Sequence, residues 1–269
     1  MNMKAKDVVV GIAAAILLLT ITVAIVLGGT GWTPLTEVRP LAKFYLENCF
    51  NVFDKSYWAA SPEAVSAMLW DYRGIDTYYE TAVFFLAIIG GVALFRIAEV
   101  KVGAISGVRR EQGLSIIVKT VTRIVFPLII TVSASVALHG HLTPGGGFQS
   151  GSMMAVAFLT AIAAFSRYFI EEHLRLTKDK FLTLRTVGLV TIAILVLAPI
   201  LAGSITLMQN QAKPWSPATS FPEALGFVWT AGSIFYYNLA EFLAVGAGFT
   251  LLFLLISMPE EEFRRILRL

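Results

Sequence analysis

Six long apolar stretches alternate with short polar connections along this chain of 269 residues. Each stretch is close to or above about twenty residues, the helix length that crosses a roughly 30 Å hydrocarbon core. The pattern therefore predicts an all-α integral membrane protein. Its six transmembrane helices are expected over residues 8–27, 79–97, 115–138, 151–170, 184–208 and 228–257.

The basic residues predict how these helices cross the membrane. They gather before residue 8, in residues 98–114, in residues 171–183 and in the tail, whereas residues 139–150 and 209–227 contain only Lys213. The positive-inside rule then places both termini in the cytoplasm. We read residues 8–27 as a retained anchor, because this run is too long for a signal peptide and lacks a convincing cleavage site.

Residues 28–77 form the longest polar section and carry more acidic than basic side chains. Tyr57, Trp58 and Trp70 are scattered along it, as aromatic residues are at membrane–water interfaces. Ser61 followed by Pro62 is typical of a helix N-cap and the first helical residue. We expect an interfacial amphipathic segment after the first transmembrane helix, rather than a folded soluble domain.

The composition agrees with a membrane protein. The chain is 57% hydrophobic and 14% charged, with a mean hydropathy of +0.74. Its net charge of +3 reflects the basic residues of the cytoplasmic loops. The sequence has no basic stripe interleaved with aromatic residues, which argues against a nucleic-acid-binding protein. Cys49 is the single cysteine, which excludes an internal disulfide and favours an inert apolar role over a reactive thiol.

Carboxylates inside the apolar stretches are the first candidates for chemistry. Glu241 lies near the centre of the last stretch, with Asn238 three residues earlier on the same helical face. A central charge costs about 2.5–3.5 kcal/mol on insertion scales. Glu241 is therefore either a protonatable or cation-contacting group on an ion path or a hydrogen-bonded residue that joins this chain to a neighbour. Glu80, nearer the outer boundary, either exchanges a proton or simply extends to the interface.

Basic residues in the third stretch are a second group of candidates. Lys119 and Arg123 lie four residues apart, before Pro127, which is expected to kink the helix. We interpret Lys119 as an anchor at the cytoplasmic end. For Arg123, which lies deeper, both an anchor and a role in a cation path stay open.

The connection over residues 138–151, LHGHLTPGGGFQSG, contains two histidines, a proline and five glycines. His139 and His141 lack a third ligand nearby, which argues against a metal site and favours proton exchange near an outer opening. The glycines lack the lysine and the strand of a phosphate-binding loop. We expect this connection to bring the third and fourth spans together on the outer side, away from the buried carboxylates.

Two motifs resemble known families. PGGGFQSG, in a short connection between two spans, resembles the signature of the B-type subunit of the Mrp-type multisubunit monovalent cation/proton antiporters, and this resemblance covers residues 115–257. The matching residues are Pro144, Gly145, Gly146, Gly147, Phe148 and Gly151. DYRGIDTYYE resembles the C-terminal end of the large A-type subunit of these antiporters, although Tyr78 and Tyr79 replace its usual small or aliphatic pair. The matching residues are Asp71, Tyr72, Arg73, Gly74, Asp76, Thr77 and Glu80.

These resemblances imply a fusion in three parts. Residues 1–70 would be an anchor with an outer interfacial segment, residues 71–110 an A-type segment with one span, and residues 111–269 a B-type domain of four helices. The same modules occur in the membrane arms of energy-converting hydrogenases and sulfur reductases. The resemblance also implies that Glu80 takes part in ion or proton translocation, whereas the case for Glu241 is physical.

We therefore expect a non-catalytic, multi-pass component of a Na⁺/proton antiporter module in a prokaryotic plasma membrane, either free-standing or within a redox complex. Its expected partners are other antiporter-type subunits, Na⁺, H⁺ and lipid, and no motif for haem, iron–sulfur, nucleotide or quinone is visible. The alternative is a scaffold that seals neighbouring subunits; an intramembrane enzyme lacks a nucleophile or metal constellation. The predicted translocation residues are Glu80, Glu241, Asn238, Arg123, His139 and His141.

Overall fold

The computed structural model describes residues 5–27, 38–102, 113–218 and 221–257, and their side chains except in residues 5–10 and 95–102. The chain divides into two compact units, residues 1–44 and 45–269, which are described separately. Both predicted cytoplasmic termini lie outside the described residues, so the predicted orientation stays a prediction.

The first unit contains helix α1, Ala5–Val26. Its described side chains, from Gly11 onward, are apolar except for Thr20 and Thr22. Both hydroxyls donate to backbone carbonyls four residues earlier, at 2.8 Å. The polar atoms of this helix are thus satisfied internally, as a lipid environment requires. The described apolar part is shorter than a full span, so a crossing by α1 stays a prediction.

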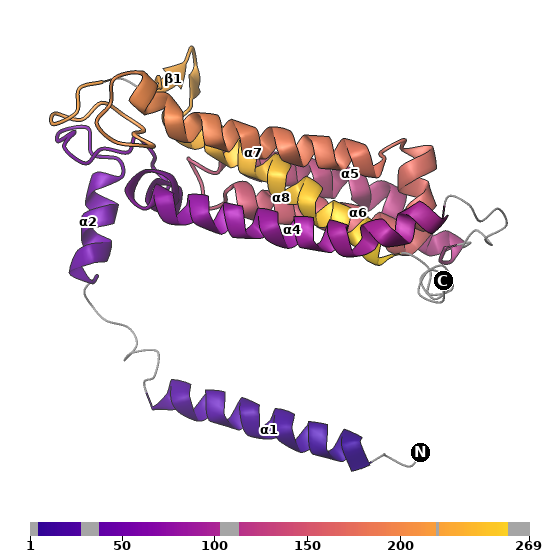
Figure 1. Ribbon diagram of the computed structural model, residues 1–269. Coiled ribbons are helices and arrows are strands. Elements are labelled where there is room, and N and C mark those ends of the chain that lie inside the picture. Colours follow the sequence, from indigo (N-terminus) through magenta and orange to yellow (C-terminus); the bar gives the residue numbers. More distant parts are fainter. Residues whose placement is uncertain (1–4, 28–37, 103–112, 219–220, 258–269) are drawn as a thin grey trace. The chain divides into compact units, whose positions relative to one another are not determined.

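The second unit is built on five helices that, among the described residues, are long and apolar enough to cross a membrane (Figure 1). They are α4 Gly74–Val102, α5 Ile116–His139, α6 Gly147–Phe165, α7 Lys178–Leu201 and α8 Ile234–Ile256. The predicted second to sixth spans are therefore present as helices. Their boundaries differ where backbone geometry intervenes.

The starts of two helices differ from the predicted starts, and the backbone geometry explains both differences. Helix α6 begins at Gly147, four residues before the predicted start, because the glycine-rich stretch itself forms its first turn. Helix α8 begins at Ile234, six residues after the predicted start. Positive φ angles at Ala231 and Gly232 interrupt a helix there, and residues before them form a short strand pair.

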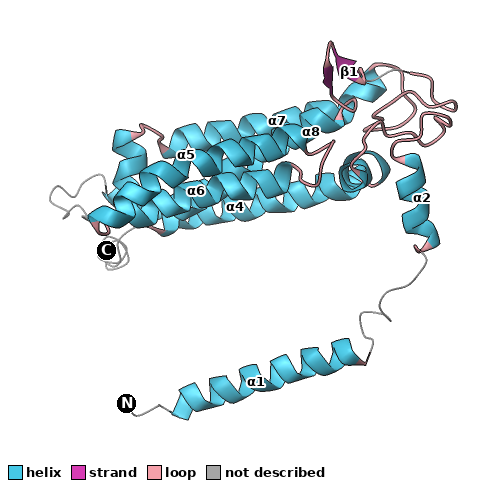
Figure 2. Ribbon diagram, turned by 180° about the vertical axis from the view of Figure 1, so that it is seen from behind, coloured by secondary structure: helices cyan, strands magenta, loops and turns pink. Residues whose placement is uncertain are grey.

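Helix α8 is the centre of the bundle. In its most apolar window 61% of the residues are buried, against 17% in α4 and in α5. It packs against α4, α6 and α7 (Figure 2). The α6–α8 contact is a direct backbone approach, because a Cβ on Gly151 would lie 2.9 Å from the Gly246 nitrogen. Small residues allow such approaches between membrane helices.

One end of the bundle carries a folded cap, which we define as residues 45–73 and 202–233. The cap contains the end of α2 (Pro40–Asn48), α3 (Ala64–Ala67), the π-helix η1 (Met68–Tyr72) and the antiparallel strands β1 (Ala224–Leu225) and β2 (Val228–Trp229). It lies where α4 and α8 begin and α7 ends (Figure 1).

The cap differs from the predicted amphipathic segment. Trp58 and Trp70 are buried within it, rather than placed along a helix surface. Asn210 ties its two chain segments together: its side-chain amide donates to the Ala59 carbonyl, and its oxygen accepts from the Ser233 amide at 2.6 Å. The residues therefore fold against each other.

The predicted helix start in the cap is also wrong. Glu63, rather than Ser61, caps α3, and its carboxylate accepts from the amides of Val65 and Ser66. The Ser61 hydroxyl instead donates to the His141 carbonyl at 2.7 Å. The predicted division into residues 1–70, 71–110 and 111–269 stays a prediction.

Candidate functional site

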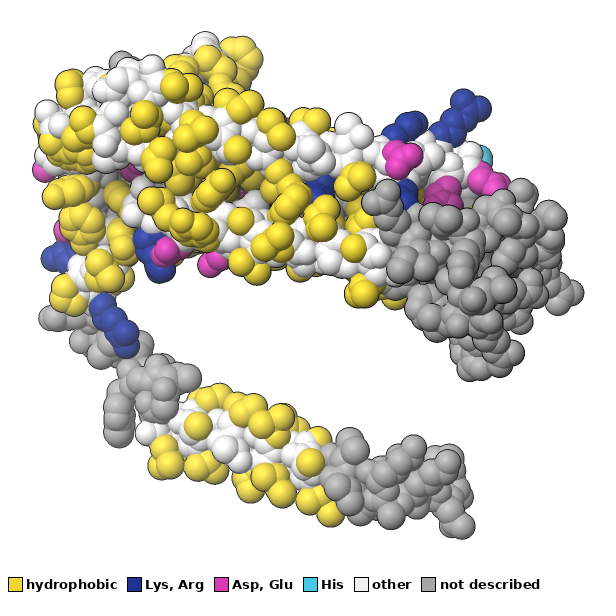
Figure 3. Space-filling view, viewed as in Figure 1, with side chains coloured by type: hydrophobic (Ala, Val, Ile, Leu, Met, Phe, Trp, Pro, Cys, Tyr) yellow, Lys and Arg dark blue, Asp and Glu magenta, His cyan; other side chains and the backbone are white. Residues whose placement is uncertain are grey.

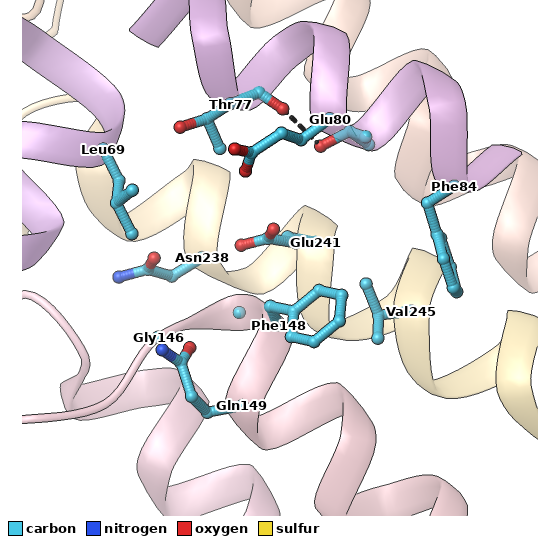
Figure 4. Close-up of a pocket in the computed structure, with 12 residues that line it drawn as sticks. Leu69, Thr77, Glu80, Phe84, Gly146, Phe148, Gln149, Asn238, Glu241 and Val245 are labelled. Carbon is cyan, nitrogen blue, oxygen red and sulfur yellow. Dashed lines mark hydrogen bonds between the residues drawn. The ribbon is translucent and has the colours of Figure 1, made fainter. Parts of the chain in front are cut away.

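A cavity of about 230 Å³ lies between α4, the start of α6 and α8, next to the cap (Figure 4). Residues from all three helices line it, and both predicted intramembrane glutamates are among them. Its lining includes Thr77, Glu80, Thr81 and Phe84 of α4, Gly147, Phe148 and Gln149 of α6, and Asn238, Glu241 and Val245 of α8.

Glu241 is the deepest carboxylate of this cavity. It lies two turns into α8 and is only 7% exposed. A Cβ on Gly147, the first residue of α6, would lie 2.7 Å from a carboxylate oxygen of Glu241, and the neighbouring backbone N–H of Phe148 faces the same carboxylate. The amides of a helix N-terminus point outward without intrahelical partners and carry a partial positive charge, so they stabilise an anion. Helix α6 thus begins against the Glu241 carboxylate.

Gly147 makes this arrangement possible. A Cβ at this position would lie 2.5 Å from both the Asn238 carbonyl oxygen and the Glu241 Cβ. Any larger residue would push the first turn of α6 away from α8. The expectation that the glycine-rich connection lies away from the buried carboxylates is therefore wrong, because its last glycines form the wall next to Glu241.

Glu80 enters the same cavity from the opposite wall. It lies in the second turn of α4, and its carboxylate and that of Glu241 are turned toward the same space (Figure 4). The hydroxyl of the neighbouring Thr81 donates to the Thr77 carbonyl at 2.9 Å, so it is used within α4. Two carboxylates facing one small cavity repel each other, which favours a proton or a cation between them.

Asn238 connects the cavity to the cap. The indole N–H of Trp70 donates to its side-chain oxygen at 3.2 Å, and the Trp70 ring stacks on Tyr237 with centroids 4.4 Å apart. The Asn238 amide nitrogen is buried without a partner among the described residues. Trp70 was read from sequence only as an interfacial aromatic, because nothing in its local pattern announces a contact with α8.

The motif over residues 71–80 supports the cap and the start of α4. Asp71 is buried and forms an ion pair with Lys213 at 3.1 Å, and the Lys213 ammonium also donates to the Trp58 carbonyl. Burial raises the pKa of Asp71 more than the Lys213 charge lowers it. Arg73 and Asp76 pair on the surface, and a Cβ on Gly74 would lie 2.7 Å from the Met208 methyl carbon. Glu80 is the residue of this motif that carries a charge into the cavity.

Three predicted translocation residues lie elsewhere. The ring nitrogen Nδ1 of His139 lies 2.9 Å from the Ser135 carbonyl. His141 is buried in the cap with Nε2 at 2.7 Å from the Trp229 carbonyl, and burial lowers its pKa. Arg123 lies over the Phe165 ring, at the far end of α6. None of these side chains lines the described cavity. Their predicted role in translocation therefore has no geometric support.

No group of three or more His, Cys, Asp or Glu side chains that could hold a metal ion occurs among the described residues. Cys49 is buried in the cap, and burial raises the pKa of its thiol. A thiol in such a setting stays protonated and unreactive at neutral pH. The polar side chains that line the cavity carry carboxylate, amide and hydroxyl groups.

Sequence reasoning missed Arg185. This arginine of α7 is 1% exposed, with its guanidinium carbon 4.7 Å from the centre of the Phe85 ring. Its Nε and Nη1 have no hydrogen-bond partner among the described residues. A charged residue within the predicted span 184–208 was the available signal, because intramembrane charges need a reason.

Comparisons with known proteins agree with this architecture. A family described as a domain related to the MnhB subunit of Na⁺/H⁺ antiporter matches residues 117–251, half of the chain. A protein named as putative antiporter subunit mnhB2 in Staphylococcus haemolyticus is 32% identical over 97 residues, which cover 36% of this chain and 67% of that protein. An uncharacterized Methanocaldococcus jannaschii protein is 29% identical over 221 residues, 76% of this chain and 80% of its own.

Two solved structures share the fold. One is a chain of the membrane-bound sulfane sulfur reductase, an archaeal respiratory membrane complex, with a TM-score of 0.64, 24% identity and coverage of 93% of this chain and 98% of that one. The other is a chain of the Mrp complex from Dietzia sp. DQ12-45-1b, with a TM-score of 0.61 and 18% identity. Nearly all of this chain, 96%, matches 26% of that longer chain.

Proposed function

The chain belongs to the family of domains related to the MnhB subunit of the Na⁺/H⁺ antiporter, and from this premise we propose that it is a non-catalytic subunit that contributes its cavity to ion and proton translocation. The resemblance of the PGGGFQSG region to the B-type antiporter component is confirmed by this match and by the mnhB2 relatives. The proposal adds which residues do the work.

The observation that carries the proposal is the pairing of Glu80 and Glu241 across one intramembrane cavity. Glu241 has no cationic partner among the described residues that line the cavity. A carboxylate in this setting is held by a helix N-terminus and can still gain a proton or contact a cation. Asn238 also lines the cavity, and its amide nitrogen, which has no partner among the described residues, is a free hydrogen-bond donor for a carboxylate or a water there.

In the proposed mechanism, a cation and a proton replace each other at the two carboxylates. When a cation enters, both glutamates are ionised and the cation neutralises their repulsion. When the cation leaves, a proton replaces it on one of the two groups, because two bare carboxylates in a small cavity are unfavourable. The first turn of α6 fixes Glu241 during both steps. Cation and proton therefore compete for one site.

The finer assignments extend this proposal. We propose that the cation is Na⁺, that the membrane is a prokaryotic plasma membrane, and that the partners are other antiporter-type subunits. The parent assembly is either a free-standing antiporter or the membrane arm of a hydrogenase or sulfur reductase. The likeness to one chain of each kind of assembly supports both settings equally.

The test replaces each glutamate by its neutral isostere. In membrane vesicles that contain the assembled complex, Glu241→Gln and Glu80→Gln are expected to lower Na⁺-dependent proton transport at least about tenfold, since each removes a charge that the exchange needs. Glu223→Gln is the matched control, because that carboxylate lies on the cap surface and pairs with Lys55. Native gels verify that each complex assembles. Normal transport in both assembled cavity variants would contradict the proposed translocation and favour the alternative of a scaffold that seals neighbouring subunits.

A further inference from the structure

Helix α4 has one face that the described chain leaves uncovered. Thr77, Thr81 and Ile88 are buried on the side toward α8. Exposed residues recur every three or four positions on the other side, which places them on one face of the helix. We define this open face of α4 as Asp76, Glu80, Val83, Ala87, Gly90 and Leu94.

The open face gives the carboxylate cavity a side entrance. A groove on this face is lined by Arg73, Asp76, Tyr79, Val83 and Ala87, and Glu80 and Phe84 line both this groove and the cavity. These two side chains therefore lie between the cavity and the groove. Glu80 lies about 9 Å along α4 from Gly74, at 1.5 Å per residue. It therefore lies within a helix that is long and apolar enough to cross a membrane, and the apolar side chains that continue along the bundle are yellow in Figure 3.

Lipid is a poor neighbour for this face. A carboxylate that faces hydrocarbon is strongly disfavoured, and intramembrane charges face protein or water instead. Arg73 and Asp76 satisfy each other near the helix start, but no ion pair is found for Glu80 among the described residues. The Glu80 side chain lines both the cavity and the groove, so a hydrogen-bond donor from outside the described chain can reach its carboxylate from the groove.

Gly90 supplies an independent observation on the same face. A Cβ at Gly90 would meet nothing within 4 Å, whereas a Cβ on the adjacent Gly91 would lie 2.6 Å from the Leu252 side chain. Glycine weakens a helix, and no packing within the described chain accounts for it at this position. With Ala87 one turn earlier, Gly90 gives the shallow surface that lets another membrane helix approach closely.

We propose that the open face of α4 is the docking site for a transmembrane helix of a neighbouring subunit. That helix carries a lysine, an arginine or another hydrogen-bond donor opposite Glu80 and packs closely over Ala87 and Gly90. It thereby closes the side entrance of the cavity. The docking itself stands on the exposed face, and only the importance of closing the cavity rests on the proposed function.

Other occupants fit the face less well. The described part of α1 offers only Thr20 and Thr22 as polar side chains, and both hydroxyls are used within that helix. A second copy related by twofold symmetry would place acidic residues of the same face near each other. A donor-bearing helix from a different polypeptide satisfies both the charge and the shape.

The first experiment tests the shape of the face. In the full complex, Gly90→Leu is expected to lower the amount of neighbouring membrane subunits that co-purify with this chain at least fivefold. Gly11→Leu is the matched control, because it makes the same substitution at a helix position where a Cβ also meets nothing within 4 Å, outside the open face. Co-purification unchanged by Gly90→Leu, with the chain present at normal levels, would overturn the proposal.

The second experiment tests the chemistry at Glu80. Glu80→Gln keeps a hydrogen-bond acceptor, and Glu80→Leu removes it at similar size, so only the leucine variant is expected to weaken co-purification. Equal assembly of both variants would overturn the proposed donor. Because Glu80→Gln assembles but lacks the charge, its transport tests the proposed function separately. Normal transport there would refute translocation by Glu80 without touching the docking site.

The third experiment identifies the occupant. A photoreactive p-benzoylphenylalanine replaces Leu94, which is already a large and 79% exposed side chain of the open face, and membranes with the complete complex are irradiated. The expected product is a covalent adduct with a second, different membrane polypeptide. An adduct with α1 of the same chain, an adduct with another copy of this chain, or adducts with lipid alone would each overturn the proposal.

Discussion

Asp71 in the cap and Glu241 in the cavity are both deeply buried, and their surroundings differ sharply. The Asp71 side chain is 6% exposed and has the Lys213 ammonium at 3.1 Å. Glu241 is 7% exposed, and the backbone amide of Phe148 lies beside its carboxylate. A fixed counter-ion occupies the position that another cation would take beside a carboxylate, whereas a backbone amide leaves that position open. The same side-chain chemistry thus serves structure in the cap, whereas in the proposed function it serves exchange in the cavity.

Breaking the ion pair should have the largest effect on stability. Lys213→Met leaves Asp71 buried without a counter-ion, and we expect a loss of about 3–5 kcal/mol in the free energy of unfolding. Lys55→Met is the control, because the Lys55–Glu223 pair is largely exposed and should contribute about 0–1 kcal/mol. Thermal unfolding of the purified complex measures both. The double variant Lys213→Met/Asp71→Leu should recover most of the loss; a fully stable single variant would contradict the role given to the pair.

Crowding the cavity should have the next largest effect. Gly147→Ala places a Cβ 2.5 Å from Glu241 and Asn238 atoms, so α6 must shift, at about 1–3 kcal/mol. Transport should fall as well, because the shift withdraws the Phe148 amide from Glu241. Gly11→Ala, where nothing lies within 4 Å, is the control. If Gly147→Ala changed neither unfolding nor transport, the close approach would not matter.

The link between cap and cavity can be weakened without breaking either. Trp70→Phe removes the donor to Asn238 but keeps a ring on Tyr237, so we expect a loss of about 1 kcal/mol. Trp215→Phe is a useful comparison, since the half-exposed Trp215 donates to the Ser56 carbonyl at 3.1 Å where water can replace it. Chemical denaturation of the two variants should rank Trp70 above Trp215. The reverse order would contradict the assigned contact.

A pH effect in the cap should be the smallest. Burial lowers the pKa of His141 below its ordinary value of 6.5, so the folded protein holds a neutral imidazole. As pH falls through 6.5 the unfolded chain takes up the proton first, so this stability is present above that pH and lost below it. The slope cannot exceed about 1.4 kcal/mol per pH unit.

Melting temperatures at several pH values measure this effect. His141→Gln should flatten the decline between neutral and mildly acidic pH, because it removes the group that titrates. His139→Gln, on the exposed last residue of α5, should leave the decline as it is. An identical decline in wild type and His141→Gln would assign the pH dependence to other groups.

Much of the fold could be predicted from the sequence. Apolar length predicted the helices that became α4 to α8, because lipid requires each spanning segment to be long and apolar by itself. The orientation inferred from loop charge stays a prediction. The cap could not be predicted this way. Its contacts, such as Asn210 with Ala59 and Ser233, join residues far apart in sequence, and no periodic pattern encodes them.

The site was predicted in part. Glu241 and Glu80 stood out because charges within apolar stretches are costly, and Asn238 followed from helical spacing. The glycine-rich connection was placed correctly between its spans but wrongly away from the carboxylates, because sequence does not reveal that α6 begins at Gly147 against α8. Trp70 and Arg185 were missed for the same reason: each acts through a helix that is distant in the chain.

The start of α6 on Glu241 has a mechanical consequence. An α-helix of 19 residues is a stiff rod of about 28 Å, at 1.5 Å per residue. Its other end is Phe165, whose ring lies under the Arg123 guanidinium of α5 at 5.5 Å. Because the two ends of a stiff helix move together, α6 links the wall of the cavity mechanically to that ring. Arg123 does not line the cavity, but α6 connects the Phe165 ring beneath it to the cavity wall.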